Sequence, residues 1–296
     1  MLSAHSDTVW PVGTLEWMPF CVEGERVFGP GVYDMKAGLV VLLEAVRRAS
    51  ERRRALRIFL TADEEVGSPT GRRLLEQAAE GVAAGFVVEP PGPTGNLKTA
   101  RKGLGRFTLT VAGRPAHAGK PAEGVSATEE LAHQIHALHS LNDEGRGTSV
   151  NVGVVCGGTS GNVVAPEAEA RFDVRVPDTV ERERVEREMA ELKPVDPEAS
   201  LELDGSWTRP PLERSEGAAA LFARAREHGR ALGLELDEEA SPGGSDGNLL
   251  AAVGVPVLDG LGAEGSGACA RDEHVVLPSI PLRAELLPRL LREPGL

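Results

Sequence analysis

The sequence is poor in cysteine, with three cysteines in 296 residues. Cys21, Cys156 and Cys269 are widely spaced and odd in number, so they do not form the disulfide framework of a small secreted domain. Cysteines that form no disulfide framework are typical of proteins in a reducing compartment. We therefore expect a cytoplasmic protein.

Long apolar runs and positive charge are also scarce. No apolar run approaches the roughly 18 residues that a membrane span needs, and the start "MLSAHSD" has neither the basic nor the apolar region of a secretory signal. The 32 Lys and Arg against 45 Asp and Glu leave a formal net charge of −13. This balance argues against a nucleic-acid surface or anionic lipid. We expect a small molecule or peptide as partner, with no nucleic acid and no membrane.

What is present is a regular alternation of strand-like and helix-like segments. A chain of this length suits one large domain or two modest ones. An opening strand, a helix in 34–54, a strand in 57–65, a capped helix in 68–80 and a strand in 85–91 follow one another. This rhythm predicts an α/β fold with a mostly parallel sheet and helices on both faces.

The rhythm changes near residue 100. Segments 97–103 and 105–113 resemble antiparallel strands, and further helices and strands follow up to 207. After residue 210 the α/β alternation resumes, with helices in 217–233 and 282–293. The sequence therefore predicts an inserted α+β, ferredoxin-like domain at 100–209. The first domain would comprise 1–99 and 210–296.

A histidine and several acids follow the strands predicted for the first domain. In parallel sheets, ligands bind beyond the carboxyl ends of the strands. The polar residues at those ends are His5, Asp7, Glu64, Glu65 and Glu89, and the loop that follows the first strand adds Asp34. Such acids repel one another unless a cation lies among them. Nitrogen and carboxylate donors suit zinc, and a carboxylate shared by two ions makes a two-metal hydrolytic site. Taken singly, each acid also fits a solvated loop, and the His5–Asp7 pair also fits a surface turn.

These motifs resemble a known family. In this order, the chain contains "HSDTV", "GPGVYDMKAG", "TADEEVGS", "VVEP", "GRPAHAGKPAEGVSA" and "GGSDGN". They resemble the aminoacylase/carboxypeptidase family of co-catalytic zinc metallopeptidases, in particular its glutamate carboxypeptidase branch, along the whole chain. The resemblance implies two Zn²⁺ per chain, with Co²⁺ or Mn²⁺ as substitutes. It also implies cleavage of the amide bond to a glutamate-like C-terminal amino acid in N-acyl or peptide substrates. An N-acyl amino acid deacylase is the alternative.

The resemblance also implies a role for each residue. His5 and Glu89 would hold one zinc, Asp34 would bridge both ions, and Glu65 would help to hold the second. Glu64 would be the general base, and Asp7 would orient His5. The inserted domain would form a homodimer, in which His117 stabilises the oxyanion across the interface. The substrate-binding groups would be Asn162, Arg175 and Arg209.

Several of these residues have a simpler interpretation. His117 also fits an ordinary loop histidine, Arg175 a strand residue paired with a nearby acid, and Asn162 a residue that holds a turn. The histidines of "HQIHALH" (His133, His136 and His139) recur every three residues on a helix. We expect them to form a solvated or dimer-facing stripe rather than a metal site.

The chain departs from the family pattern in two places. Cys269, in "GSGACARDEHVV", stands where the family has a histidine ligand of the second zinc. A thiolate is also a good zinc ligand, so Cys269 is a candidate; His274 fits a position that is not a ligand in the family. Relatives also carry strand and helix elements before "HSDTV", so we expect an uncovered edge of the sheet. Both departures favour a third interpretation, an inactive truncated paralogue that acts as a binding or dimerising module.

Overall fold

The computed structural model describes residues 1–49 and 55–292, which divide into two compact units. The first unit comprises Met1–Arg101 and Leu212–Leu296, and the second is Lys102–Pro211. Each unit has its own hydrophobic core. We therefore describe them one at a time.

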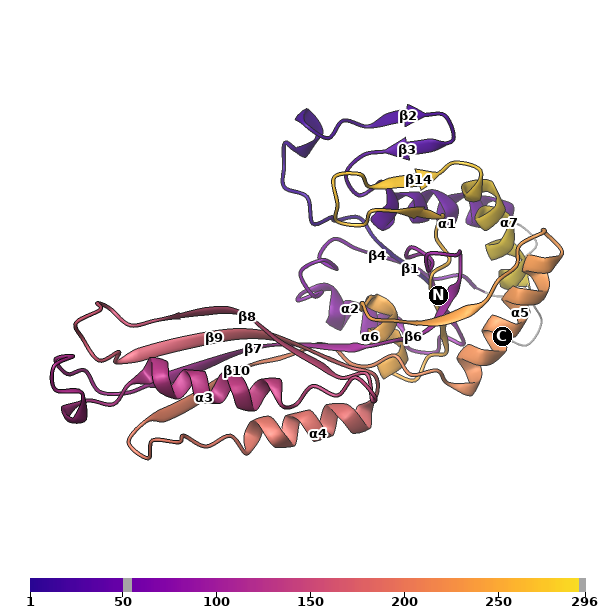
Figure 1. Cartoon of the computed structure of the whole chain (residues 1–296). Coiled ribbons are helices and arrows are strands. Elements are labelled where there is room, and N and C mark those ends of the chain that lie inside the picture. The colour runs from indigo at the N-terminus through magenta and orange to yellow at the C-terminus, as the bar shows by residue number, and fades with distance from the viewer. Residues whose placement is uncertain (50–54, 293–296) are drawn as a thin grey trace. The chain divides into compact units, whose positions relative to one another are not determined.

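The first unit is built on a parallel sheet with the strand order β12-β5-β1-β4 (Figure 1). In chain order its strands are β1 (Leu2–His5), β4 (Ile58–Thr61), β5 (Gly85–Val87) and β12 (Val257–Leu258). All of their pairings are parallel, so that Leu2 lies between Ile58 and Phe86. The mostly parallel sheet expected from the sequence is confirmed.

Helices cover both faces of this sheet because neighbouring residues of its strands point to opposite sides. Phe86 of β5 belongs to the core that α1, α5 and α7 share, whereas the next residue, Val87, packs in the core of α2 and α6. The helices are α1 (Ala37–Arg48), α2 (Gly71–Ala78), α5 (Glu216–Arg230), α6 (Asp246–Ala252) and α7 (Ser279–Arg292). Residues 50–54 and 293, which we predicted to be helical, lie outside the described residues. None of the described helices is long and apolar enough to cross a membrane.

Two smaller sheets complete the first unit. An antiparallel sheet of order β13-β14-β3-β2 contains β2 (Cys21–Glu23), β3 (Arg26–Phe28), β13 (Gly265–Ser266) and β14 (His274–Val276). A parallel pair contains β6 (Leu97–Arg101) and β11 (Glu238–Ser241). Here our prediction was wrong, because we expected 97–103 to be an antiparallel strand, whereas β6 pairs parallel with β11. The buried ion pair of Arg101 with Asp259 explains the difference, since it holds the end of β6 inside the first unit.

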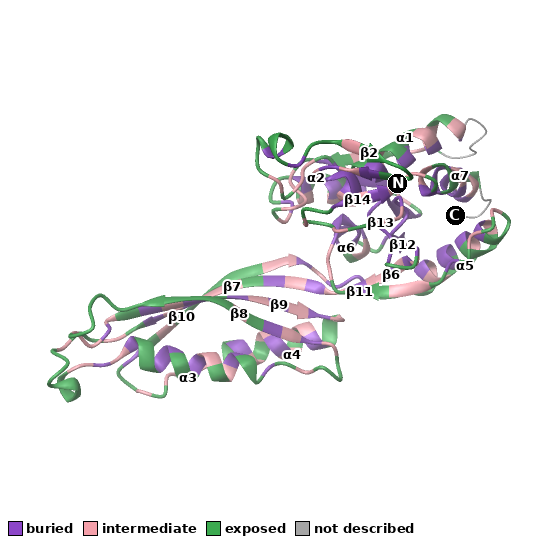
Figure 2. Cartoon of the chain, turned by 45° about the horizontal axis from the view of Figure 1, so that its top comes forward, coloured by how far each residue is buried: buried purple, intermediate pink, exposed green. Residues whose placement is uncertain are grey.

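The second unit is an antiparallel sheet with two helices on one face (Figures 1 and 2). The strand order is β10-β7-β9-β8, and the elements are β7 (Gly103–Ala112), α3 (Ala127–His139), β8 (Ser149–Gly157), β9 (Glu167–Val176), α4 (Thr179–Ala190) and β10 (Ser200–Arg209). Leu131 and Leu138 of α3 and Val185 of α4 pack on Phe172 of the sheet. This is an open-faced α+β layer of the expected kind. Short helical turns lie at Thr14–Glu16 in the first unit and at Pro121–Glu123 in the second.

Candidate metal centre

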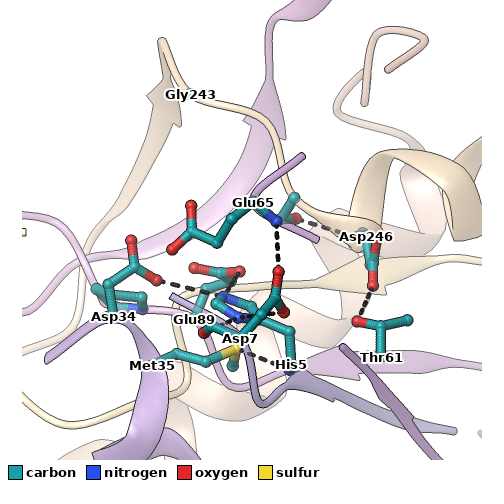
Figure 3. Close-up of polar contacts among 12 residues, drawn as sticks. His5, Asp7, Asp34, Met35, Thr61, Glu65, Glu89, Gly243 and Asp246 are labelled. Carbon is teal, nitrogen blue, oxygen red and sulfur yellow. Dashed lines mark hydrogen bonds and ion pairs between the residues drawn. The ribbon is translucent and has the colours of Figure 1, made fainter. Parts of the chain in front are cut away.

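The centre of the candidate site is the imidazole of His5, at the carboxyl end of β1. His5 is 2% exposed. Its Nδ1 lies 3.3 Å from Asp7 Oδ1, and its Nε2 lies 3.4 Å from both Asp34 Oδ1 and Glu89 Oε1 (Figure 3). One ring nitrogen thus faces a single carboxylate, and the other faces two. Metal-ligating histidines commonly have this arrangement, in which a carboxylate orients the ring through the nitrogen that does not bind the ion.

The sheet order explains how acids so far apart in sequence meet at His5. Strands β4 and β5 flank β1, so the loops that leave their carboxyl ends emerge beside His5. The loop after β4 carries Glu64 and Glu65, and Glu89 follows β5. Asp34 comes from the irregular turn Val32–Lys36 that precedes α1, where the Asp34–Met35 peptide bond is cis. The topology therefore places the site where ligand sites of parallel sheets generally lie.

The electrostatics of this cluster favour a cation. Burial, together with the charge of Asp34, raises the pKa of Glu65 to about 7 and that of Glu89 to about 8. Burial acts to lower the pKa of His5, but the carboxylates of Asp34 and Glu89 beside its ring outweigh burial and raise that pKa to about 12. Three of the buried oxygens without a hydrogen-bond partner in the described part of the chain are carboxylate oxygens of this cluster: Asp7 Oδ1, Asp34 Oδ1 and Glu65 Oε1. The site has more acceptor oxygens than the protein has donors for them.

Among the described residues, two overlapping sets of side chains have the spacing of metal ligands. One is His5, Glu64 and Glu89, and the other is His5, Asp34 and Glu65; within each set the ligand atoms lie within 4.8 Å of one another. Imidazole nitrogen and carboxylate oxygen are donors that zinc and related divalent cations accept. The residues present therefore fit a metal centre, and the buried oxygens without donors are the observation that supports the fit.

Cys269 belongs to neither of these two sets, which were sought among the described residues only. It lies exposed in a turn with a φ of 61°, in the left-handed region. Partial burial of its sulfur, together with the charges of Glu65 and Asp34, raises the thiol pKa to about 11. His274 is likewise outside both sets, and its ring lies 5.2 Å from that of Phe28.

The remaining predicted site residues lie in the second unit. His117 is on an exposed loop, and the amide of Ala118 donates to the Asn162 carbonyl, so His117 and Asn162 are neighbours. Asn162 Oδ1 accepts a hydrogen bond from the Ser160 hydroxyl within a turn. Arg175 pairs with Asp173 at 2.9 Å, and Arg209 is buried at the end of β10. His133, His136 and His139 are all exposed on α3.

Sequence reasoning missed two buried carboxylates that hold the loops of the site. Asp246 accepts hydrogen bonds from the Thr61 and Ser68 hydroxyls, which lie on either side of the Glu64–Glu65 segment. Glu273 accepts four hydrogen bonds from Trp10 and the Asp34 turn. Their partners lie 178 to 263 positions away in the sequence. No local pattern marks such residues, since only the folded chain brings the partners together.

Fold and site together define an α/β protein with a carboxylate-rich candidate metal centre at the ends of its parallel strands. Comparison with known proteins adds that the chain belongs to peptidase family M20/M25/M40, which it matches over residues 1–293. It is 29% identical to carboxypeptidase G2 of Pseudomonas sp. (strain RS-16) over 311 residues, covering 100% of this chain and 74% of the relative. It is 26% identical to human (Homo sapiens) aminoacylase-1 over 331 residues, covering 100% and 81%. The structure of the aminopeptidase PepT from Bacillus cereus ATCC 10987 is similar in fold, with a TM-score of 0.77, 21% identity, and 98% of this chain and 79% of that chain covered.

Proposed function

We propose that this protein is a dinuclear zinc hydrolase. It would cleave the amide bond to a C-terminal, glutamate-like amino acid in N-acyl or peptide substrates. The observation that carries the proposal is the convergence of four acids on one buried histidine, two of them at its Nε2. Similarity to carboxypeptidase G2 along the whole chain supports the carboxypeptidase reaction. Similarity to aminoacylase-1 supports the second candidate, an N-acyl amino acid deacylase.

In this proposal each residue around His5 has one task. Bound cations would polarise the scissile carbonyl and lower the pKa of water. Asp7, at Nδ1, fixes the tautomer of His5, and its other oxygen accepts a hydrogen bond from the Glu65 amide at 3.0 Å. Asp34 would contribute to both metal positions, His5 and Glu89 would hold the first cation, and Glu65 and Cys269 would hold the second. Glu64 takes a proton from the attacking water and delivers it to the leaving nitrogen.

The second unit would supply a homodimer and the substrate-binding groups. We assign to His117 the hydrogen bond to the oxyanion, given across the dimer interface. The guanidinium groups of Arg175 and Arg209, with Asn162, would bind the substrate carboxylate, since arginine donates two parallel hydrogen bonds to such a group. The exposed loop position of His117 supports this assignment.

The first prediction tests this function through Glu64→Gln. Glutamine cannot accept the proton from water, so we expect turnover to fall by about 10²-fold or more while two zinc ions per chain remain bound. Zinc content and hydrolysis of N-acyl-glutamate, N-acyl-leucine and dipeptide substrates are the measurements. Glu80→Gln, an exposed site, is the matched control.

Loss of zinc together with activity would make Glu64 a ligand, and a wild-type chain that binds no metal would refute the metal centre. Preference between glutamyl peptides and simple N-acetyl amino acids separates the two candidate reactions.

A further inference from the structure

The carboxylate of Glu273 lies in a cradle of N–H groups. Glu273 is 0% exposed, yet it stands in the turn between β13 and β14, on the same loop as Cys269. Its Oε2 accepts hydrogen bonds from Trp10 Nε1 and the Gly31 amide, both at 2.9 Å. Its Oε1 accepts from the amides of Tyr33 and Asp34, at 3.0 and 3.1 Å. Both oxygens are therefore satisfied by two donors each.

Three of these four donors belong to the short segment that presents Asp34. Gly31 has a φ of 71°, and a Cβ at this position would lie 2.3 Å from Thr8 Cγ2, so the chain turns tightly there. The turn directs the Gly31, Tyr33 and Asp34 amides toward one acceptor. The same residue, Asp34, places Oδ1 3.4 Å from His5 Nε2. A shift of this turn would therefore move Asp34 relative to His5.

We propose that Glu273 is a positioning residue for Asp34, and that it fixes the Asp34 turn against the loop that carries Cys269. The inference rests on the proposed metal centre, in which Asp34 is shared by both cations. An ionised carboxylate is suited to this task because it has only acceptors and forms hydrogen bonds stronger than those of a neutral group. A glutamine here would keep one acceptor oxygen and turn an NH2 group toward two N–H donors.

Two variants separate positioning of Asp34 from general packing. Glu273→Gln replaces an oxygen that accepts from the turn, whereas Trp10→Phe removes the indole donor and leaves all three backbone donors of the turn in contact with Glu273. If Glu273 acts through Asp34, Glu273→Gln should alter metal binding and Trp10→Phe should not. Glu273→Asp keeps the carboxylate but withdraws it by one methylene, and serves as a second variant should Glu273→Gln not fold.

The experiment is titration of the metal-free full-length chains with Co²⁺, followed by visible absorption, together with amide hydrogen exchange of residues 29–36 without metal. For Glu273→Gln we expect at least about tenfold weaker cobalt affinity, as for other groups that orient metal ligands, an altered cobalt spectrum and faster exchange. Trp10→Phe should retain the wild-type affinity and spectrum, and Glu273→Asp should bind cobalt more weakly than wild type.

The inference is wrong if Glu273→Gln binds cobalt with wild-type affinity and spectrum. If Glu273→Gln does not fold, the same result in Glu273→Asp would overturn it. It is also wrong if Glu273→Gln and Trp10→Phe lose cobalt affinity equally. If the wild-type chain binds no cobalt, the metal centre of the proposed function fails. Exchange then decides the inference by itself: unchanged exchange at 29–36 in Glu273→Gln overturns it, and faster exchange supports the link between Glu273 and the turn.

Discussion

At the scale of single residues, Cys269 stands where the family resemblance led us to expect a histidine ligand. Its pKa of about 11 means that the thiol is protonated in the metal-free protein at neutral pH. A cation has to displace that proton before the sulfur can ligate, since thiolate is the form that binds metal. Once bound, the thiolate adds a negative charge that a neutral imidazole does not bring, beside Asp34, Glu65 and Glu89.

The second prediction follows from this charge difference. Cys269→His should raise hydrolysis at pH 7 several-fold and abolish sensitivity to thiol oxidants, because less charge is donated to the cation and imidazole resists oxidation. Histidine also tolerates the left-handed backbone better than most residues, and φ here is 61°. Zinc content and rate against pH, for both forms, are the measurements. If the variant holds no more zinc and works no faster, and Cys269 alkylates readily with metal present, Cys269 is not a ligand and the inactive paralogue becomes the better interpretation.

The raised pKa values of the site give the third prediction, a pH-dependent response to zinc. The folded-state pKa values of Glu65 and Glu89, about 7 and about 8, lie above the ordinary value of 4.5. The metal-free fold thus binds more protons than the unfolded chain, and this stabilisation is lost as pH rises from 4.5 through 7 and 8. In the proposed metal centre, zinc would take the place of those protons. The rise in Tm on adding zinc should therefore grow from pH 5.5 to pH 8.5.

Thermal unfolding with and without zinc at each pH measures how the zinc effect on Tm changes with pH. Groups that do not touch the metal change the Tm with and without zinc alike, so they cancel in the difference. In Glu89→Gln, zinc has no carboxyl proton to displace at position 89. The increase of the zinc effect on Tm between pH 5.5 and pH 8.5 should therefore be smaller than in the wild type. A zinc effect on Tm that stays constant, or shrinks, between pH 5.5 and 8.5 would show that protons and metal do not compete for these carboxylates.

At the scale of secondary-structure elements, helix α2 begins differently from what its sequence indicates. "SPTG" predicts a local cap by Ser or Thr, but Thr70 at the N-cap position makes no capping hydrogen bond to the helix. Asp63 caps it instead: Oδ2 accepts from the Thr70 and Gly71 amides at 2.8 and 2.9 Å. The residue next to Glu64 thus anchors the metal-site loop to the helix that follows.

The fourth prediction is that Asp63→Ala destabilises the first unit by about 1 kcal/mol, the usual effect of losing an N-cap. Urea unfolding followed by tryptophan fluorescence is the measurement. Thr70→Ala is the matched control, since it removes only a hydroxyl that donates to Asp63. Equal or greater destabilisation by Thr70→Ala would instead favour the local cap that the sequence suggests.

Elements also show what the sequence could reveal about the site and what it could not. His5, Glu64, Glu65 and Glu89 were found because a parallel sheet brings the ends of its strands to one edge, and this rule needs only strand positions. The sequence predicted an antiparallel strand where β6 lies, because its parallel partner is far away along the chain. Its actual partner, β11, begins at Glu238, and the Arg101–Asp259 ion pair spans 158 positions. Glu273 and Asp246 were missed for the same reason.

At the scale of the whole molecule, two exposed sheet edges are candidates for self-association. Within the described part of the chain, β4 pairs with β1 alone and β8 pairs with β9 alone. Leu60 on β4 and Val154 on β8 are similar in exposure, at 55% and 53%. An unpaired strand with exposed apolar side chains is a template for a second chain.

The fifth prediction distinguishes these edges. If the homodimer forms through the second unit, as we propose, it would use β8 rather than β4. Val154→Lys then places a charge in each copy of a twofold interface and should weaken the dimer by about tenfold or more, because repeated like charges oppose each other across a symmetric contact. Leu60→Lys, the matched control, should leave the dimer intact. Sedimentation over a range of concentrations measures the dimer content of both variants.

A dimer weakened by Leu60→Lys and not by Val154→Lys would assign association to β4. Hydrolysis that falls together with dimer content in Val154→Lys would support a site that needs His117 of the partner subunit.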